Sequence, residues 1–189
     1  VSANVPPLVT EPAGQTVAEG SLLVLNIQAT DPNIGQSLTY SLDLAPPGVT
    51  LNSTTGELRW TPPDGPTTEV FTVRVTDDAV PALSSTATFN VTVTNVAPSL
   101  QISGPATIVP GESFVLSLSA TDPGADTISQ WVIDWGDSVQ IVSGSPASVP
   151  HVYATAGNYT ISAQATDEDG TYASNSLTVR ANTPPTVQN

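Results

Sequence analysis

The chain has no cysteine and no methionine among its 189 residues, and it contains a single histidine. The absence of cysteine excludes disulfide bonds, thiolate metal sites and cysteine nucleophiles. With one histidine and no cysteine, an ordinary zinc site is excluded as well. No run of about 18 apolar residues is present, so membrane insertion is not expected. The N-terminal residues lack a start methionine and the features of a signal peptide, which favours an internal piece of a longer protein.

Positive charge is also scarce, because three arginines and no lysine stand against 17 acidic residues, for a net charge of −14. Such a chain cannot form the basic patch that nucleic acids or anionic membrane surfaces require. Clustered carboxylates instead favour divalent cations as partners. A second interpretation is that the acidity keeps an extracellular protein soluble. The two interpretations are compatible.

Three short motifs recur at a spacing of about 90 residues, which indicates an internal repeat. The recurring pairs begin at Asn4 and Asn95 (Asn-Val-x-Pro), at Ala29 and Ala120 (Ala-Thr-Asp-Pro), and at Thr76 and Thr166 (Thr-Asp followed by an acidic residue). Near-equal offsets predict two domains of one architecture, at residues 1–94 and 95–181. A third Asn-x-Pro-Pro begins at Asn182, so residues 182–189 are expected to start a truncated further module or a linker.

Apolar residues alternate with polar ones in several short segments, as in Phe71, Val73 and Val75, which are separated by Thr72 and Arg74. The same alternation runs through residues 23–29, 87–93, 114–120, 159–165 and 177–179. Prolines and glycines separate these segments, and no stretch has helical spacing. The pattern predicts an all-β fold of two tandem Ig-like antiparallel β-sandwiches arranged end to end.

In four of these strands the inward-facing series continues in phase onto an aspartate. The four residues are Asp31, Asp77, Asp122 and Asp167. Because side chains alternate between faces along a strand, each carboxylate is expected on the core side at the end of its strand. The second and sixth strands of a seven-stranded sandwich run in the same direction, and the first strand starts at the end where they finish. An asparagine at domain entry and two aspartates therefore converge in each domain.

Crowded carboxylates repel one another, and a hard cation with several oxygen ligands resolves that conflict. The sequence therefore predicts two calcium sites. The first comprises Asn4, Asp31, Asn33 and Asp77, and the second comprises Asn95, Asp122, Asp126 and Asp167. A cation in the second site would tie residues 95–98 onto the following domain. The alternative is that the aspartates only open turns, since aspartate readily caps its own backbone.

Residues 95–181 resemble the polycystic-kidney-disease (PKD) domain. The resemblance rests on Ile133-Asp-Trp-Gly-Asp-Ser138 and on residues 151–161, which follow a His-x-Tyr…Gly-x-Tyr pattern. Ile133 replaces the first aromatic residue of the family pattern Trp-Asp-Phe-Gly-Asp-Gly, and Ser138 replaces its final glycine. The resemblance implies an Ig-like spacer or binding unit, as in surface proteins and secreted hydrolases. Some members bind calcium at the domain entry, and the matching positions are Asn95, Asp122 and Asp167, with a looser match at Asp126.

Residues 4–94 resemble the dystroglycan-type cadherin-like or putative Ig (He-PIG) class. The resemblance rests on residues 45–62, in which a proline-rich turn precedes a short strand and Thr55-Gly56 leads into the next strand. It extends to residues 71–78, Phe-Thr-Val-Arg-Val-Thr-Asp-Asp. This class too implies an Ig-like sandwich.

No combination of residues supports catalysis, so the chain is not expected to be an enzyme. Asp134 and Asp137 flank a turn at Gly136, whereas glycoside hydrolysis needs carboxylates across a cleft. His151 has no Gly-x-Ser-x-Gly nucleophile elbow to serve, and it is expected to pack or hydrogen-bond at a strand start. The chain is therefore predicted to be a non-catalytic structural or adhesive segment of a secreted or cell-surface protein.

The expected partners are calcium ions, other modules of the same long chain, and a cell-surface protein or glycan. The alternative function is a carbohydrate-binding accessory segment of an extracellular polysaccharide-degrading enzyme. That function needs exposed, coplanar aromatic rings on which sugars stack. Trp131 and Trp135 share a face with Ile133 and are expected in the core, whereas Trp60 is expected to be partly exposed.

Overall fold

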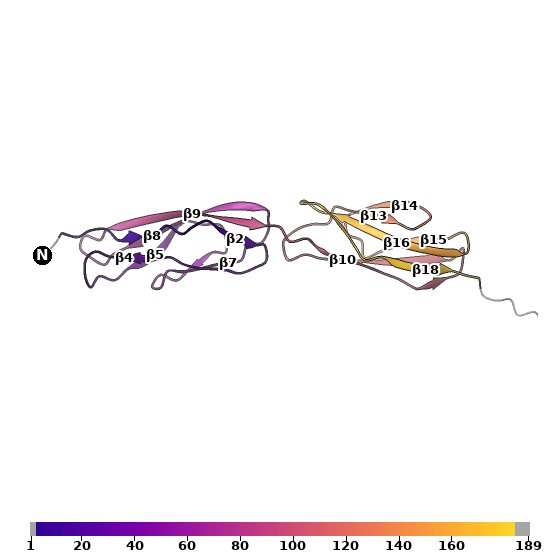
Figure 1. The fold of residues 1–189 in the computed structure, drawn as a ribbon, viewed down its shortest axis with the longest axis horizontal. Coiled ribbons are helices and arrows are strands. Elements are labelled where there is room, and N and C mark those ends of the chain that lie inside the picture. Colours follow the sequence, from indigo (N-terminus) through magenta and orange to yellow (C-terminus); the bar gives the residue numbers. More distant parts are fainter. Residues whose placement is uncertain (1–2, 184–189) are drawn as a thin grey trace, which may run out of the picture. The chain divides into compact units, whose positions relative to one another are not determined.

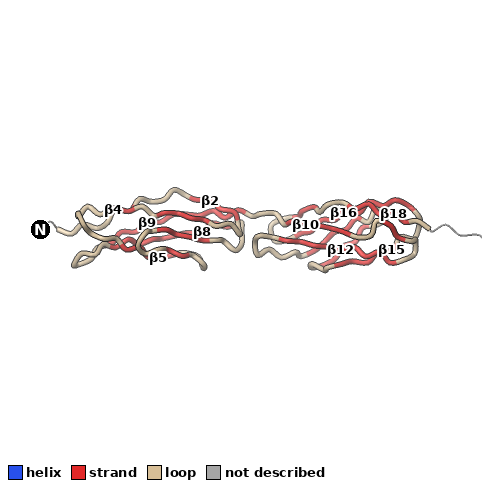
Figure 2. Tube along the Cα trace, turned by 90° about the horizontal axis from the view of Figure 1, so that it is seen from below, coloured by secondary structure: helices blue, strands red, loops and turns tan. Residues whose placement is uncertain are grey.

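The computed structural model describes residues 3–183, and these form two compact units that are divided between Val96 and Ala97 (Figure 1). All regular elements of the described residues are β-strands, joined by loops and turns (Figure 2). The all-β prediction is confirmed. Among residues 3–183 no helix is long and apolar enough to cross a membrane. Of the segment predicted to start a further module, residues 184–189 lie outside the described part.

The first unit contains nine strands within its described residues. They are β1 (Leu8–Val9), β2 (Gln15–Ala18), β3 (Leu23–Asn26), β4 (Ala29–Thr30), β5 (Thr39–Leu44), β6 (Thr50–Leu51), β7 (Glu57–Trp60), β8 (Thr67–Thr76) and β9 (Ser84–Thr94). One sheet has the order β2-β9-β8-β5 and another the order β3-β7-β6, while β1 pairs with β4. The β2–β9 pairing is parallel and the other pairings are antiparallel.

The core of the first unit is filled by the inward-facing series that the sequence pattern predicts. Phe71 stacks on Phe89, and Trp60 meets the edge of Phe71. One prediction needs correction, because residues 23–29 do not form one continuous strand. The chain leaves the β3–β7 pairing at Ile27, whose N–H donates to the carbonyl oxygen of Gly56, and then pairs with β1. Ile27 remains buried, so the alternation of faces survives the change of partner.

The second unit also contains nine strands within its described residues. They are β10 (Ser99–Ser103), β11 (Thr107–Ile108), β12 (Ser113–Thr121), β13 (Gln130–Asp134), β14 (Val139–Ser143), β15 (Ser148–Val152), β16 (Gly157–Thr166), β17 (Thr171–Ala173) and β18 (Leu177–Ala181). One sheet has the order β10-β12-β15 and the other the order β11-β18-β16-β13-β14, with β17 also paired to β16. Only β11–β18 is parallel among these pairings.

Aromatic residues dominate the core of the second unit. Phe114 from one sheet packs edge-on against Trp135 and against Tyr153. Trp131 and Ile133 are also fully buried, which confirms that the alternating residues of β13 point inward. Because two facing sheets bury these side chains, each end of the sandwich is left to the loops. The strand-end aspartates emerge at one such end.

Candidate metal centre

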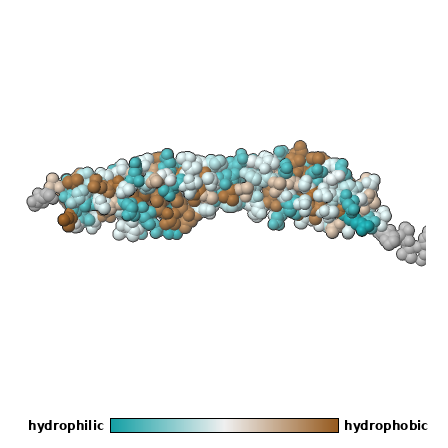
Figure 3. All heavy atoms as spheres, viewed as in Figure 1, coloured by the Kyte–Doolittle hydropathy of each residue, from teal (hydrophilic) through white to brown (hydrophobic). Residues whose placement is uncertain are grey.

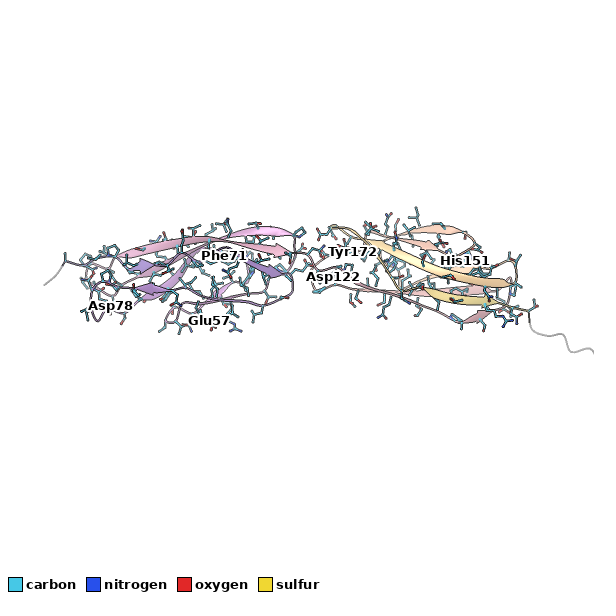
Figure 4. The ribbon with its side chains drawn as sticks, in the orientation of Figure 1. Glu57, Phe71, Asp78, Asp122, His151 and Tyr172 are labelled. Carbon is cyan, nitrogen blue, oxygen red and sulfur yellow. The ribbon has the colours of Figure 1, made fainter. Side chains whose placement is uncertain are left out.

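Asn4 joins the entry of the first unit to the loop that follows β8. Its Nδ2 donates hydrogen bonds of 3.0 Å to Asp77 Oδ2 and of 3.0 Å to the Pro81 carbonyl oxygen. Its Oδ1 accepts a hydrogen bond of 3.1 Å from Gln36 Nε2. Figure 4 shows Asp78, the neighbour of Asp77, at the end of the first unit where the described chain begins. Segments far apart in sequence therefore meet at the domain entry, as the strand directions require.

Asp31 and Asn33 hold the chain on both sides of Asn4. Asn33 Oδ1 accepts a hydrogen bond of 2.9 Å from the Val5 N–H, and its Nδ2 donates one of 3.2 Å to the Ala3 carbonyl oxygen. The Asn33 N–H in turn donates to Asp31 Oδ1 at 2.7 Å. The other oxygen of that carboxylate, Oδ2, is buried, and no residue between positions 3 and 183 donates to it. All four residues of the first predicted set thus take part in the structure of the entry.

Asp77 is only 4% exposed, and donors surround it. Its Oδ1 accepts hydrogen bonds of 2.9 Å from the Leu83 N–H and 3.2 Å from the Ala79 N–H, while Oδ2 accepts the Asn4 amide. Burial acts to raise the pKa of Asp77, but the hydrogen bonds from Leu83, Asn4 and Ala79 outweigh it, so the pKa lies below its ordinary value. Asp77 is therefore a stable carboxylate whose two oxygens are already occupied.

The second unit places Asp122 just after β12 and Asp167 just after β16. Asp122 Oδ1 accepts a hydrogen bond of 2.8 Å from the Gly124 N–H. Asp167 Oδ1 accepts bonds of 3.0 Å from the Asp169 N–H and 2.9 Å from the Gly170 N–H. The Oδ2 atom of each aspartate is buried and receives no hydrogen bond from the described residues. Both residues therefore keep one carboxylate oxygen without a donor.

Two further aspartates, Asp126 and Asp169, lie in the loops that Asp122 and Asp167 begin. Carboxylate oxygens of Asp122 and Asp126 lie within 4.8 Å of each other, and so do those of Asp126 and Asp169. The neighbouring Glu168 accepts a hydrogen bond of 2.8 Å from the Thr127 N–H, which ties the turn after β16 to the loop after β12. This bond and one from its own backbone N–H hold the pKa of Glu168 below its ordinary value. Asp169 was not among the residues predicted from the sequence, although the acidic run at residues 167–169 was its signal.

Each of the four aspartates opens a turn at the end of its strand. In each case Oδ1 accepts the N–H two residues further on, as an Asx turn requires. The turn uses only Oδ1 of each carboxylate, so Oδ2 needs a different partner. Asp77 Oδ2 accepts the Asn4 amide, whereas the Oδ2 atoms of the other three are buried without a donor in the described part. A buried carboxylate oxygen without a donor is costly, and a hard cation is a suitable partner for it.

Asn95, which belongs to the second predicted set, follows β9 and lies in the first unit. Its participation as a ligand therefore stays a prediction. Glu19, which was not predicted from the sequence, contacts both neighbours of Asn95 in the chain. Glu19 is completely buried, its N–H donates to the Thr94 carbonyl oxygen, and its Oε1 accepts a bond of 2.7 Å from the Val96 N–H. Glu19 fixes the last residues of the first unit to the turn after β2.

A model of the Putative Ig domain family matches residues 6–94, and a model of the PKD domain family matches residues 95–181. The chain is a He-PIG Ig-like domain followed by a PKD domain. Both resemblances noted in the sequence are thereby confirmed. Both matched domains are non-catalytic, and PKD domains are typical of extracellular proteins. No curated protein matches the chain by sequence.

Two cadherin structures show the same kind of fold. The human CDH23 EC21-23 structure matches with a TM-score of 0.50 and 18% identity over 95% of this chain and 64% of that one. Protocadherin Gamma B2 extracellular cadherin domains 3-6 match with a TM-score of 0.50 and 15% identity over 95% and 52%. The PKD domain of an M14-like peptidase from Thermoplasmatales archaeon SCGC AB-540-F20 is 26% identical over 49% of this chain and all of that domain, with a TM-score of 0.39. The chain thus spans less than two thirds of the two cadherin structures.

The signature residues of the PKD domain form a structural cluster. Asp134 Oδ1 accepts the Gly136 N–H at 2.9 Å within a tight turn, where Gly136 has a φ of 85°. His151 stacks on Trp135, and its Nε2 lies 3.0 Å from Asp137. His151 is the fourth residue of β15 and not its start, which corrects its predicted position. Figure 4 shows His151 and Asp122 towards opposite ends of the PKD domain.

The tryptophans do not form a sugar-stacking platform. Trp131 and Trp135 are fully buried, as expected, and Trp60 is only 3% exposed. The prediction that Trp60 is partly exposed is therefore wrong. Its ring packs edge-on to Phe71, and its Nε1 donates to the Pro47 carbonyl oxygen at 3.2 Å. This hydrogen bond ties the ring to the proline-rich turn that marks this class in the sequence.

Proposed function

We propose that this chain is a non-catalytic spacer or protein-interaction segment of a larger secreted or cell-surface protein, and that calcium stiffens it. Its partners in this proposal are calcium ions, neighbouring modules of the same long chain, and a cell-surface protein or glycan. The observation that carries the proposal is the pair of buried Oδ2 atoms on Asp122 and Asp167, which receive no hydrogen bond from the described residues.

The PKD domain offers the better set of ligands. Asp122, Asp126 and Asp167 supply carboxylate oxygens, and calcium takes six to eight oxygen ligands at full coordination. Asp126 lies within 4.8 Å of Asp122 by its carboxylate oxygens, so one cation is able to reach both. Asp169 adds a fourth carboxylate to this group, and Asn95 is the first residue of the PKD match.

The Ig-like domain is proposed to bind calcium more weakly. Asp31 Oδ2 and Gln36 Oε1 are buried oxygens without donors in the described part, and they favour a cation. Asn4, however, points its amide nitrogen at Asp77. A cation that used Asp77 and Asn4 as ligands would first break that hydrogen bond, and the lost bond offsets part of the binding free energy.

Calcium would act by binding the folded domain in preference to the unfolded chain. Such binding raises the free energy of unfolding in proportion to the logarithm of the calcium concentration above the Kd. In the PKD domain it would fix the loop after β12 to the turn after β16, where Glu168 already accepts the Thr127 N–H. A module whose loops are fixed in this way is stiffer than one with mobile loops. It therefore keeps the neighbouring modules of a chain at a more constant separation.

Titration calorimetry of the chelator-stripped chain with calcium, with thermal melting in parallel, tests this proposal. We expect saturable binding and a higher melting temperature for the PKD domain, both lost in the Asp122→Ala/Asp167→Ala variant. The matched control is Asp134→Ala, which removes a turn-capping carboxylate from the same domain outside the proposed site. No heat and no change of melting temperature at millimolar calcium would leave a plain acidic spacer.

A further inference from the structure

Strand β14 is an edge strand with an apolar surface. It pairs with β13 on one side and ends the sheet order of the PKD domain on the other. Val139 and Ile141 are 65% and 67% exposed, far more than a sheet interior allows. Figure 3 shows hydrophobic residues gathering on the surface of the PKD domain where Figure 1 places β13 and β14.

The backbone of β14 presents an unpaired row of hydrogen-bonding groups. Trp135 N–H donates to the Ser138 carbonyl oxygen, and Gly144 N–H donates to the Ser129 carbonyl oxygen, which sets the phase of the β13–β14 ladder. Hydrogen-bonded and non-hydrogen-bonded pairs alternate in an antiparallel ladder. The N–H and C=O groups of Val139, Ile141 and Ser143 therefore face away from β13, and no described strand pairs with them.

Other edges of the two domains carry protection that β14 lacks. On β10, the Asn175 side chain covers Ile102: its Oδ1 accepts the Ile102 N–H at 2.8 Å and its Nδ2 donates to the Ile102 carbonyl oxygen at 3.0 Å. On β15, Pro150 interrupts the edge, because proline has no N–H to donate. On β5, the charged side chain of Asp43 and a β-bulge between Leu42 and Leu44 also hinder pairing with another strand.

The edge at β14 is also free of charge. No charged residue occurs between Ser138 and Pro150, although the chain carries 17 acidic residues. A partner with the same acidic character therefore meets no carboxylate at this edge. Natural edge strands usually carry a charge, a proline or a bulge that prevents pairing with another chain. An uncharged, apolar and unblocked edge is what a pairing strand needs.

We propose that β14 pairs with β14 of a second copy of this chain, antiparallel and centred on Ile141. In this register Ile141 faces Ile141 of the partner subunit, and Val139 faces Ser143 of the partner subunit. All three outward N–H groups and all three outward C=O groups of each strand then find partners, so the register is self-complementary. The apolar side chains of the two strands meet on the outer face, beside Val132, which pairs with Ile141 across the β13–β14 ladder.

The pairing is independent of the calcium proposal, and the experiment keeps the two apart. Sedimentation velocity of the whole chain is measured over a concentration series to millimolar, in chelator, so that cations cannot bridge acidic surfaces. We expect a reversible monomer–dimer equilibrium that strengthens with added salt, because screening reduces the repulsion between two chains of net charge −14. A chain that stays monomeric throughout would overturn the proposal and leave the edge to a different partner or to solvent.

The variant Ile141→Glu places like charges opposite each other at the centre of the pairing, and the association should weaken by about tenfold or more. Gln101→Glu is the matched control, because Gln101 is also an exposed residue in the middle of an edge strand, but on the β10 edge that Asn175 covers. It should dimerise like the parent chain. Dimerisation of Ile141→Glu with unchanged affinity would contradict the assigned edge.

A second variant tests the register and does not depend on the folding of the first. Because the chain has no cysteine, Ile141→Cys introduces a single thiol. Directly opposed residues in an antiparallel pair have Cα atoms about 5.5 Å apart, within the range that a disulfide spans. Mild oxidation with copper phenanthroline should give a covalent dimer faster than for Gln101→Cys. Equal rates for the two variants would contradict the register.

Discussion

Asp77 of the Ig-like domain and Asp167 of the PKD domain occupy equivalent places, each directly after a ten-residue strand. Both are buried, and both use Oδ1 to accept backbone N–H groups of the turn that follows. They differ at Oδ2. Asn4 donates to Asp77 there, whereas no residue in the described part of the chain donates to Asp167.

The difference shows two ways in which one architecture accommodates a carboxylate at a strand end. In the Ig-like domain a neutral amide from the domain entry supplies the hydrogen bond, and the pKa of Asp77 falls below its ordinary value as a result of this and the backbone bonds. In the PKD domain the corresponding oxygen of Asp167 receives no hydrogen bond from the described residues, and under the calcium proposal a cation is its partner. Repeated sequence motifs therefore do not imply equal affinity for a cation.

The largest effect is expected from removal of the two aspartates in the absence of calcium. Asp77→Ala should lower the melting temperature of the Ig-like domain by about 10 °C, because the Leu83 and Ala79 N–H groups and the Asn4 amide lose their acceptor. Asp167→Ala should lower that of the PKD domain by only about 5 °C, since two N–H groups lose a partner while a costly buried oxygen is also removed. Differential scanning calorimetry measures both.

Calcium should change the stability cost of these two substitutions by different amounts. In millimolar calcium the cost of Asp167→Ala should grow, because the variant loses the cation as well as the turn cap, while the cost of Asp77→Ala should change little. Equal calcium responses of the two variants would show that the Asn4 amide does not separate the two sites.

An intermediate effect is expected for Asn4→Ala. The variant removes the donor to Asp77 Oδ2 and to the Pro81 carbonyl oxygen, so the melting temperature of the Ig-like domain should fall by about 5 °C. It also makes Asp77 resemble Asp167, with one oxygen lacking its donor. Calcium should therefore protect this variant more than it protects the parent chain. Asn33→Ala serves as the comparison, because Asn33 binds the Ala3 and Val5 backbone and not Asp77.

The smallest effect is a difference in acid sensitivity. Because the folded pKa of Asp77 lies below its ordinary value of 3.8, the unfolded chain binds a proton at higher pH than the folded domain does. Its contribution to stability is therefore present above that value and is lost as the pH falls below it towards the lowered pKa. Denaturant unfolding of the Ig-like domain at a series of acidic pH values should show this loss, and Asn4→Ala should show less of it. An identical pH profile for both chains would contradict the role of Asn4.

Much of this arrangement could be predicted from the sequence. The period-two phase that runs through Phe71, Val73 and Val75 correctly places Asp77 on the buried face, and the same argument correctly places Asp167. The direction of the strands correctly brings Asn4 to Asp77. These features depend on alternation and topology, which a sequence pattern determines over a whole strand.

Features that depend on individual hydrogen bonds could not be predicted. The sequence alone does not show that Asn4 donates its amide nitrogen to Asp77, or that the Pro47 carbonyl oxygen accepts a hydrogen bond from Trp60. The break between β3 and β4 keeps the alternation intact, so the pattern of residues 23–29 does not reveal it. Glu19 was missed because a single acidic residue before a glycine usually marks an exposed turn, whereas here the Val96 N–H holds it inside.

The most direct test of the account follows individual carboxyl carbons of the chain by NMR during a calcium titration. The side-chain carboxyl resonances of Asp122 and Asp167 are predicted to shift first and to saturate together, and that of Asp77 should move only at higher calcium or not at all. If Asp77 shifted first, or if Asp122 and Asp167 did not respond to millimolar calcium, the proposed difference between the two domains would be contradicted.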